Sequence, residues 1–229
     1  PDGEPQRAAP PLRDLVAGLY CAFGLLAALQ ERGNSGIGQQ VETSLTGGLI
    51  SMLAYLSAEY FATGETPKRT GNDHPIVSPY GLFHAKDGMI AVAPSTDVYV
   101  ERFLGVLGLE KLLADPNYST NSERLLHRNT LSKHIDDVTC LQSVARWMTA
   151  INDAGCPCGR VMDLAEVFED PRVLAQDMVI DVLHPGHGNV RMTGFPVKLS
   201  RTPAVIQRPA PDLGADTEDI LNNLDQQPL

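Results

Sequence analysis

The chain has 229 residues and a net charge of −10, with 43% of its residues apolar and 20% charged. That length allows one sizeable hydrophobic core or two small ones in a globular protein. The acidic balance excludes nucleic acid as the main partner, because phosphate binding needs a basic face and the sequence has no cluster of lysine or arginine. Glycine, glutamine, serine or glutamate interrupts the longest apolar stretches before the ~18–20 residues of a membrane span, so we expect no membrane partner.

The first predicted element, a helix over residues 12–31, organises the rest of the chain. Its apolar residues recur at helical spacing, and two prolines stand at its start, where the first N–H groups have no intrahelical partner. Asp14 falls in or just before the first turn. There the unpaired N–H groups and the helix dipole favour an ionised carboxylate. Taken alone, this acid predicts no more than stabilisation of the helix dipole.

Glycines mark three further features of this first segment. Gly18 and Gly24 lie inside the helix, where each costs roughly 1 kcal/mol relative to alanine. We therefore expect another element or a ligand to approach the backbone closely there. Residues 33–36, Gly-Asn-Ser-Gly, have the composition of a left-handed helix end. Residues 40–44 then predict a short strand.

The next two segments predict a second helix and a linker. An apolar stripe over residues 45–63 indicates the helix, and Gly64 ends it. Residues 65–79 are polar and contain proline and glycine, which is typical of a linker between domains.

Residues 80–195 predict a compact α+β unit between the two end segments. Asp87-Gly88 marks the turn of a first hairpin, and residues 185–188 mark the turn of a second. The expected strands are 80–84, 89–93, 158–161, 179–183 and 190–193, and the expected helices are 97–107, 121–137, 141–154, 164–168 and 171–177. From residue 196 the chain is proline-rich and extended, and it ends in a predicted helix over residues 217–224.

A series of short blocks resembles the class III CoA-transferases, also called the CaiB/BaiF family. The series begins with Asp-Leu-x-x-Gly-Leu-Tyr at residues 14–20 and Gly-x-Gly-Gln-x-Val-x-x-Ser-Leu at residues 36–45. It continues with Gly-Asn-Asp-His-Pro at 71–75, Pro-Tyr-Gly-Leu-Phe at 79–83, Asp-Gly at 87–88, Asp-Leu-Ala at 163–165, Asp-Pro-Arg-Val at 170–173, Pro-Val-Lys-Leu-Ser at 196–200 and Pro-Ala-Pro-Asp-Leu-Gly at 209–214. The blocks follow the family's order over nearly the whole chain.

This resemblance implies an α/β fold made of a Rossmann-like large domain and a smaller α+β domain. It implies that residues 1–64 are helices of the large, CoA-binding domain, 65–79 the linker, 80–195 the small domain and 196–229 a return segment with the last helix of the large domain. Members of the family form interlocked homodimers and carry a long N-terminal portion before the residue equivalent to Asp14. We therefore expect activity to need that N-terminal half, whether it belongs to a separate chain or was lost.

Asp14 occupies the place of the family's covalent nucleophile. The resemblance implies that its carboxylate attacks an acyl-CoA, passes through an anhydride and an aspartyl-CoA thioester, and hands CoA to a carboxylic acid. No tightly bound cofactor is implied, since coenzyme A is part of the substrate. Some members have a run of glycines where this chain has residues 76–80, so we expect transfer of groups larger than formyl.

Three further residues are candidates for contact with CoA or substrate. His74 and Tyr80 belong to the matched blocks, and Thr96 follows the first predicted hairpin. The histidines have no partner at metal-ligand spacing, so we expect no metal and interpret them as surface or loop residues. Lys68 and Arg69 are interpreted as solvated linker residues rather than as ligands of a CoA phosphate.

The four cysteines predict no disulfide or zinc site. Cys156-Pro157-Cys158 lacks the C-x-x-C spacing of redox and zinc sites, and Cys21 and Cys140 do not complete a second pair. We expect all four to be reduced and structural. With no recognisable signal peptide, this predicts a cytoplasmic protein.

Two other functions are open at this point. In the α-methylacyl-CoA racemase branch of the family, the equivalent aspartate is an acid–base residue. It works there with a histidine from the N-terminal part and a glutamate after the first small-domain hairpin. This chain has Pro-Ser-Thr-Asp at residues 94–97 instead, so Asp97 would have to replace that glutamate. The other alternative is a truncated, inactive chain that serves as a dimerisation scaffold.

Overall fold

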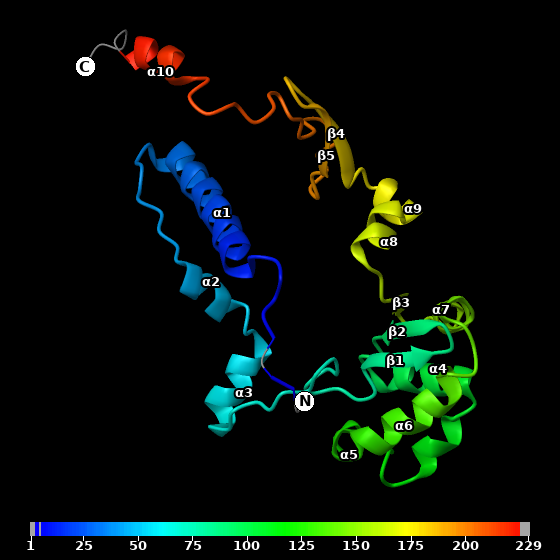
Figure 1. Cartoon of the computed structure of the whole chain (residues 1–229). Coiled ribbons are helices and arrows are strands. Elements are labelled where there is room, and N and C mark those ends of the chain that lie inside the picture. The colour runs from blue at the N-terminus through cyan, green and yellow to red at the C-terminus, as the bar shows by residue number, and fades with distance from the viewer. Residues whose placement is uncertain (1–2, 5, 225–229) are drawn as a thin grey trace. The chain divides into compact units, whose positions relative to one another are not determined.

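The structure is a computed structural model that describes residues 3–4 and 6–224 (Figure 1). The chain divides into two compact units, residues 1–159 and residues 160–229. Both units contain helices and strands, in agreement with the α/β class expected from the sequence.

The helix expected at the start of the chain is confirmed as α1 (Leu12–Ser35). Pro11 precedes its first residue, as a proline can where the first N–H groups have no helical partner. Gly36 ends it at φ 75°, and the Gly36 N–H reaches the Arg32 oxygen at 2.9 Å. Only a residue without a Cβ adopts this left-handed conformation easily, so the predicted helix end is confirmed.

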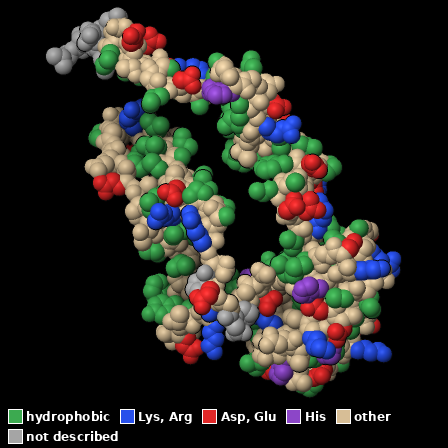
Figure 2. All heavy atoms as spheres, in the orientation of Figure 1, with side chains coloured by type: hydrophobic (Ala, Val, Ile, Leu, Met, Phe, Trp, Pro, Cys, Tyr) green, Lys and Arg blue, Asp and Glu red, His purple; other side chains and the backbone are tan. Residues whose placement is uncertain are grey.

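By length and composition alone, α1 is apolar enough to cross a membrane, with a mean hydropathy of 1.6 over 18 residues. The expectation that every apolar stretch is interrupted too early is therefore wrong, because isolated glycine and polar residues lower the mean hydropathy only slightly. Large apolar side chains are exposed along the helix (Figure 2), among them Leu19 at 71% and Phe23 at 72%. Core helices of soluble proteins and signal sequences meet the same criterion.

The strand expected over residues 40–44 is wrong. A strand needs a neighbour to take up its backbone hydrogen bonds, and no strand of the described residues lies beside this segment. Ser44 instead begins a helix, since its side-chain oxygen accepts a hydrogen bond from the Gly47 N–H at 2.9 Å.

The helix expected over residues 45–63 is divided in two. Its parts are α2 (Leu45–Ser51) and α3 (Tyr55–Thr63), and Ala54 between them has φ 47°, outside the right-handed helical region. The apolar spacing continues across this short interruption, which is why the sequence shows a single stripe. Gly64 ends α3 in the left-handed conformation, as expected.

The first hairpin is confirmed and belongs to a three-stranded sheet in the order β1-β2-β3. The strands are β1 (Gly81–Ala85), β2 (Gly88–Val92) and β3 (Cys158–Arg160). β1 and β2 are antiparallel, with Phe83 opposite Ile90, and both of these side chains face the core.

Helices cover this sheet (Figure 1). They are α4 (Asp97–Leu107), α6 (Arg128–Thr139) and α7 (Val144–Asp153). A 3-10 turn, η1 (Glu110–Ala114), follows α4, and α5 (Asn121–Leu126) contacts α6. α6 packs against β1, α7 packs against β2, and α4 contacts both helices. The helix expected over residues 121–137 is two helices, because the backbone of His127 (φ −105°, ψ 23°) leaves the helical region between α5 and α6.

The hydrophobic core of the first unit lies between the sheet and these helices. Phe83 and Phe103 pack with their ring centroids 5.7 Å apart, and Ile151 is fully buried. Trp147 is also buried and donates a hydrogen bond from Nε1 to the Thr139 oxygen at 2.7 Å.

The second unit contains short elements without such a core. They are α8 (Leu164–Glu169), α9 (Pro171–Leu174), the antiparallel pair β4 (Val179–His184) and β5 (Gly188–Thr193), and α10 (Thr217–Leu224). Among the described residues of this unit, only Asp170 is buried.

The positions of β4, β5 and α10 confirm the second hairpin and the last helix expected from the sequence. The domain limits 64/65, 79/80 and 195/196 stay predictions, and residues 225–229 of the last segment lie outside the described residues.

Candidate active site

Asp14 lies in the first turn of α1, as the sequence predicts. Its side chain is 54% exposed, and its Oδ2 lies 3.6 Å from Nε of Arg13, which is itself 64% exposed. Water screens an ion pair between two exposed groups, so this contact holds the carboxylate only weakly. The oxygen atoms of Asp14 are therefore accessible to a reactant.

A close approach of α2 to α1 supports the turn that follows Asp14. Ala17, three residues after Asp14, is the one buried residue of α1, and Gly48 is the one buried residue of α2. A Cβ atom on Gly48 would lie 3.2 Å from Cγ1 of Val16 and 3.4 Å from the Ala17 nitrogen. Glycine at position 48 thus lets the two helix backbones pack closely beside the aspartate. The sequence reasoning missed this contact, although a glycine pair in an apolar helix was a signal for it.

A hydrogen bond between side chains also links α1 and α2. Ser51 donates to the Gly48 oxygen at 2.7 Å, and its Oγ lies 2.9 Å from the Tyr20 hydroxyl. Since the single Ser51 proton goes to Gly48, the Tyr20 hydroxyl is the donor to Ser51. Tyr20 and Ser51 are 31 positions apart in the sequence, and no local sequence signal connects them.

The two glycines singled out inside α1 differ. A Cβ on Gly24 would lie 2.8 Å from Cγ1 of Val41, so the expected close approach is confirmed there. Around Gly18 no heavy atom of the described chain lies within 4 Å of such a Cβ, so no element of the described residues approaches that position, and the approach of a ligand stays a prediction. The surface around Gly18 is open, on the same helix as Asp14.

His74 and Tyr80 are brought together, with a third ring that the sequence did not indicate. The ring centroids of His74 and Tyr80 lie 4.7 Å apart and are stacked. Tyr55 of α3 also stacks on His74, at a centroid distance of 5.7 Å, with its hydroxyl 3.4 Å from Nε2. The His74 N–H also donates to the Tyr80 oxygen at 2.8 Å. Both candidates thus belong to one aromatic stack.

The contacts of His74 indicate a neutral imidazole. Its Nδ1 accepts a hydrogen bond from the Ile76 N–H at 3.3 Å, which leaves the ring proton on Nε2, toward the Tyr55 hydroxyl. Burial lowers the pKa of His74, and the positive charge of Arg128 lowers it further. Arg128 is held nearby, since its Nη2 donates to the His74 carbonyl oxygen at 2.6 Å.

Thr96 lies at the start of α4, where its side chain makes no capping hydrogen bond. The next residue, Asp97, pairs with the buried guanidinium of Arg124. Arg124 also donates to the Ser78 oxygen at 2.7 Å and to the Tyr118 oxygen at 3.2 Å. Asp97 therefore belongs to a structural network around Arg124.

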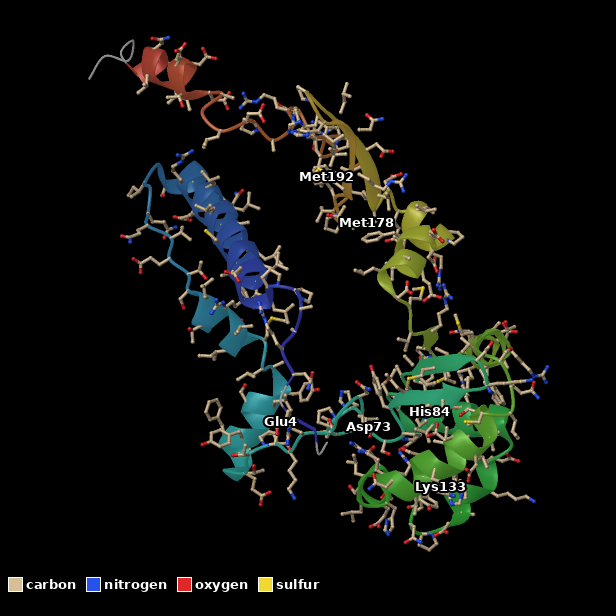
Figure 3. The ribbon with its side chains drawn as sticks, in the orientation of Figure 1. Glu4, Asp73, His84, Lys133, Met178 and Met192 are labelled. Atoms are coloured by element: carbon tan, nitrogen blue, oxygen red, sulfur yellow. The ribbon has the colours of Figure 1, made fainter. Side chains whose placement is uncertain are left out.

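The remaining histidines and the cysteines show ordinary structural environments. His84 lies on β1 (Figure 3), and its Nδ1 is 3.3 Å from Oδ2 of Asp136. All four cysteines are free thiols, and burial raises the pKa of both Cys156 and Cys158 to about 11. A thiol with such a pKa stays protonated and is a poor nucleophile at neutral pH. Within residues 3–4 and 6–224, no group of three or more metal-ligating side chains is assembled.

Comparison with known proteins identifies a family whose sequence model matches most of this chain. A sequence model described as CoA-transferase family III matches residues 1–217. The succinate–glutarate CoA-transferase of Agrobacterium fabrum is 29% identical over 98% of this chain and 56% of its own length. The acetyl-CoA:oxalate CoA-transferase of Acetobacter aceti is 32% identical over 93% of this chain and 54% of its own length. The chain thus spans about half the length of these curated relatives.

Solved structures agree at the level of the fold. A crystal structure of a CAIB/BAIF family protein from Brucella suis matches with a TM-score of 0.76 and 28% identity, over 98% of this chain and 58% of that one. A protein of Mycobacterium tuberculosis matches with a TM-score of 0.81 at 18% identity, over 95% of this chain and 57% of that one, which shows the fold alone.

Proposed function

Because this chain belongs to CoA-transferase family III, we propose that it is part of an enzyme that moves coenzyme A from an acyl-CoA to a carboxylic acid. The family match over residues 1–217 carries this proposal. We place Asp14, in the first turn of α1, at the centre of the reaction. The curated relatives are about twice as long, so we further propose that activity needs an N-terminal half, in the same chain or another.

The proposed reaction starts with attack of an Asp14 carboxylate oxygen on the thioester carbonyl carbon of the acyl-CoA. The C–S bond breaks, CoA leaves as the thiolate, and Asp14 becomes one side of a mixed anhydride. The thiolate then attacks the Asp14 carbonyl, which releases the donor acid and leaves an aspartyl-CoA thioester. The acceptor carboxylate repeats these steps in reverse, so that a new acyl-CoA leaves and the Asp14 carboxylate is restored.

The setting of Asp14 supports the first step and indicates what the later steps need. A carboxylate is already ionised at neutral pH, so it needs no general base, and the weak contact with Arg13 leaves it free to attack. An anhydride must be kept from water, whereas Asp14 is exposed. We therefore propose that the N-terminal half and a second subunit of a homodimer cover the face of α1 that carries Asp14.

The substrates follow from the same comparison. The names of the relatives contain dicarboxylic acids, glutarate and oxalate among them, so a dicarboxylic acid is the acceptor class we propose. CoA thioesters enter as substrates, and we propose no tightly bound cofactor. The free thiols of the cysteines fit the cytoplasm as the compartment.

A racemase is the second candidate, and two observations disfavour it. Its acid–base role after the first hairpin would fall to Asp97, which is already engaged by the buried Arg124. The curated relatives compared above are CoA-transferases by name. The inactive scaffold is left as an outcome of the experiment below.

The experiment traps the acylated aspartate. The chain is incubated with succinyl-CoA and hydroxylamine, with and without an N-terminal half taken from a relative, and Asp14 is examined by peptide mass spectrometry. We expect an Asp14 hydroxamate, or a CoA-sized adduct without hydroxylamine, when both halves are present. Asp14→Asn should remove the adduct and lower CoA transfer to glutarate by at least ~10⁴-fold, the size of effect that follows loss of a nucleophile.

The matched control is Asp219→Asn, which removes an acid from the first turn of α10. It should leave the adduct and the transfer rate unchanged. If no adduct forms on Asp14 while CoA transfer proceeds, the covalent mechanism is wrong. If neither transfer nor adduct occurs with both halves present, the scaffold explanation replaces the enzyme. Exchange of the α-proton of a 2-methylacyl-CoA without transfer would favour the racemase.

A further inference from the structure

A cavity of about 420 Å³ lies between the segment before β1 and the start of α6, at a distance in sequence from Asp14. The segment before β1 can be found in Figure 3 by the label on Asp73. Most of the residues that line this cavity are polar or charged. They are Lys68, Arg69, Thr70, Asp73, Arg128 and Asn129. No local pattern predicts the cavity, because its two walls are at least fifty positions apart in the sequence.

Three of the lining residues are cations. Within the described residues, Lys68, Arg69 and Arg128 have no carboxylate within salt-bridge distance. With the single acid Asp73, the cavity carries a formal charge of +2 when that acid is ionised. The whole chain has a net charge of −10, so this local sign is opposite to that of the molecule.

Backbone contacts hold two of these cations in place. Arg128 is half-buried and donates from Nη2 to the His74 oxygen at 2.6 Å, which leaves its other N–H groups for the cavity. Arg69 donates from Nη1 to the Gly3 oxygen. A guanidinium fixed in this way loses less side-chain freedom when it binds a ligand, and its planar donors match the oxygen atoms of a phosphate.

One acid, Asp73, stands among these cations and is held in place by its neighbours. Asp73 is half-buried, and its carboxyl packs where a Cβ on Gly81 would otherwise stand. Burial raises the pKa of Asp73, and the nearby Arg128 opposes that rise. The Thr70 hydroxyl donates to the Asp73 backbone oxygen at 2.7 Å, which fixes the turn that carries both residues.

From this arrangement we propose that the cavity is a binding site for a phosphate-bearing anion, with Arg128, Arg69 and Lys68 as the phosphate ligands. A phosphate monoester carries a charge of about −1.5 to −2 at neutral pH, which matches the local charge of the cavity. The phosphate could be the 3′-phosphate of CoA or that of another small molecule. The first source would make the cavity part of the substrate site and rests on the proposed function, whereas the second would not.

The test measures binding without turnover, so it does not depend on Asp14. Inorganic phosphate, CoA and 3′-dephospho-CoA are titrated separately into the full chain by calorimetry at low salt. The double variant Lys68→Gln/Arg69→Gln changes two exposed side chains, and its fold is checked by circular dichroism. We expect it to weaken phosphate binding at least tenfold, and we expect binding by the unchanged chain to weaken as salt rises.

Lys133→Gln is the matched control, because Lys133 is an exposed lysine farther along α6 (Figure 3). It should leave phosphate affinity unchanged. If the double variant weakens CoA but not 3′-dephospho-CoA, the ligand is the 3′-phosphate of CoA. Equal weakening of both assigns the cavity to the diphosphate that the two molecules share. If neither is weakened while inorganic phosphate is, the cavity takes the phosphate of another small molecule. The proposal is overturned if phosphate does not bind at ~10 mM, or if the double variant binds it as tightly as the unchanged chain.

Discussion

Two regions of the same unit use apolar residues in opposite ways. Between β1 and β3, the side chains of Phe83, Ile90, Phe103 and Ile151 are at most 1% exposed. In α1, α2 and α3, only Ala17 and Gly48 are buried, and large side chains such as Phe23 remain mostly exposed. Both regions have similar apolar spacing in the sequence, yet only one of them forms a core of its own.

This difference indicates that one region stabilises the unit, whereas the other offers a surface for the active site. Burial of apolar area is the main favourable term in folding, so the region between β1 and β3 supplies most of the stability of the unit. An apolar surface that stays exposed is typical of a site where other protein packs. Asp14 lies on such a surface, which agrees with our proposal that further polypeptide completes the active site.

The largest expected effect comes from truncating the core. Phe103→Ala removes a fully buried ring that packs on Phe83, and we expect it to lower the free energy of unfolding by about 4 kcal/mol. Phe23→Ala removes a ring of the same size from the exposed face of α1 and should cost less than about 0.5 kcal/mol in this chain. Urea denaturation measures both. Equal losses would show that the two regions do not differ as described.

A smaller loss is expected from the network around Arg124. This guanidinium is 2% exposed and binds the oxygens of Ser78 and Tyr118 as well as Asp97. Arg124→Met keeps the length of the side chain but leaves those oxygens unpaired, and we expect a loss of about 3 kcal/mol. Arg146→Met, at an exposed position of α7, serves as the control and should change stability by less than about 0.5 kcal/mol. If Arg124→Met lowered the free energy of unfolding by no more than the control does, the hydrogen bonds of Arg124 would not contribute to the stability of this unit.

The two glycines of α1 and α2 test the packing beside Asp14. Gly18→Ala adds a methyl group to an open helix surface and should stabilise the chain by up to about 1 kcal/mol. Gly48→Ala has the same helical advantage, but its methyl group meets Val16 and Ala17, so its gain should be smaller or negative. Thermal unfolding followed by circular dichroism compares the two. If both variants gain equally, α2 does not pack on α1 as closely as the structure indicates.

The smallest expected effect is the pH dependence of the stack of Tyr55, His74 and Tyr80. The pKa of native His74 is lowered, so just below about pH 6.5 the unfolded chain binds a proton that the native chain does not. Stability should therefore be present above that pH and fall as the pH drops below it. The raised pKa of Asp73 acts in the opposite direction, in the lower pH range of carboxyl groups.

Chemical denaturation at a series of pH values measures this slope. His74→Gln should flatten it, whereas His187→Gln, at an exposed position of the second unit, should not. A slope that persists in His74→Gln would assign the pH dependence to another group.

Local signals were sufficient for the elements that close over a few residues. Asp87-Gly88 marked the β1–β2 turn, and Gly108 ends α4 in the left-handed conformation at φ 70°. The position of Asp14 in the first turn of a helix was likewise readable, since prolines and apolar spacing set the start of α1. The break at Ala54 was not, because the apolar stripe of residues 45–63 continues through it.

By its resemblance to a known family the sequence indicated the family and the α/β class. By itself it also determined the main elements of the chain and the place of Asp14, because caps, turns and apolar spacing act within one or two turns of the chain. Only the tertiary structure decided that Tyr55 joins His74 and Tyr80, that Arg124 takes up Asp97, and that Arg128 meets Lys68 and Arg69 around one cavity. The physical reason is the separation of these residues along the chain. Contacts between distant residues depend on how the helices and strands pack, and local sequence patterns carry no record of that packing.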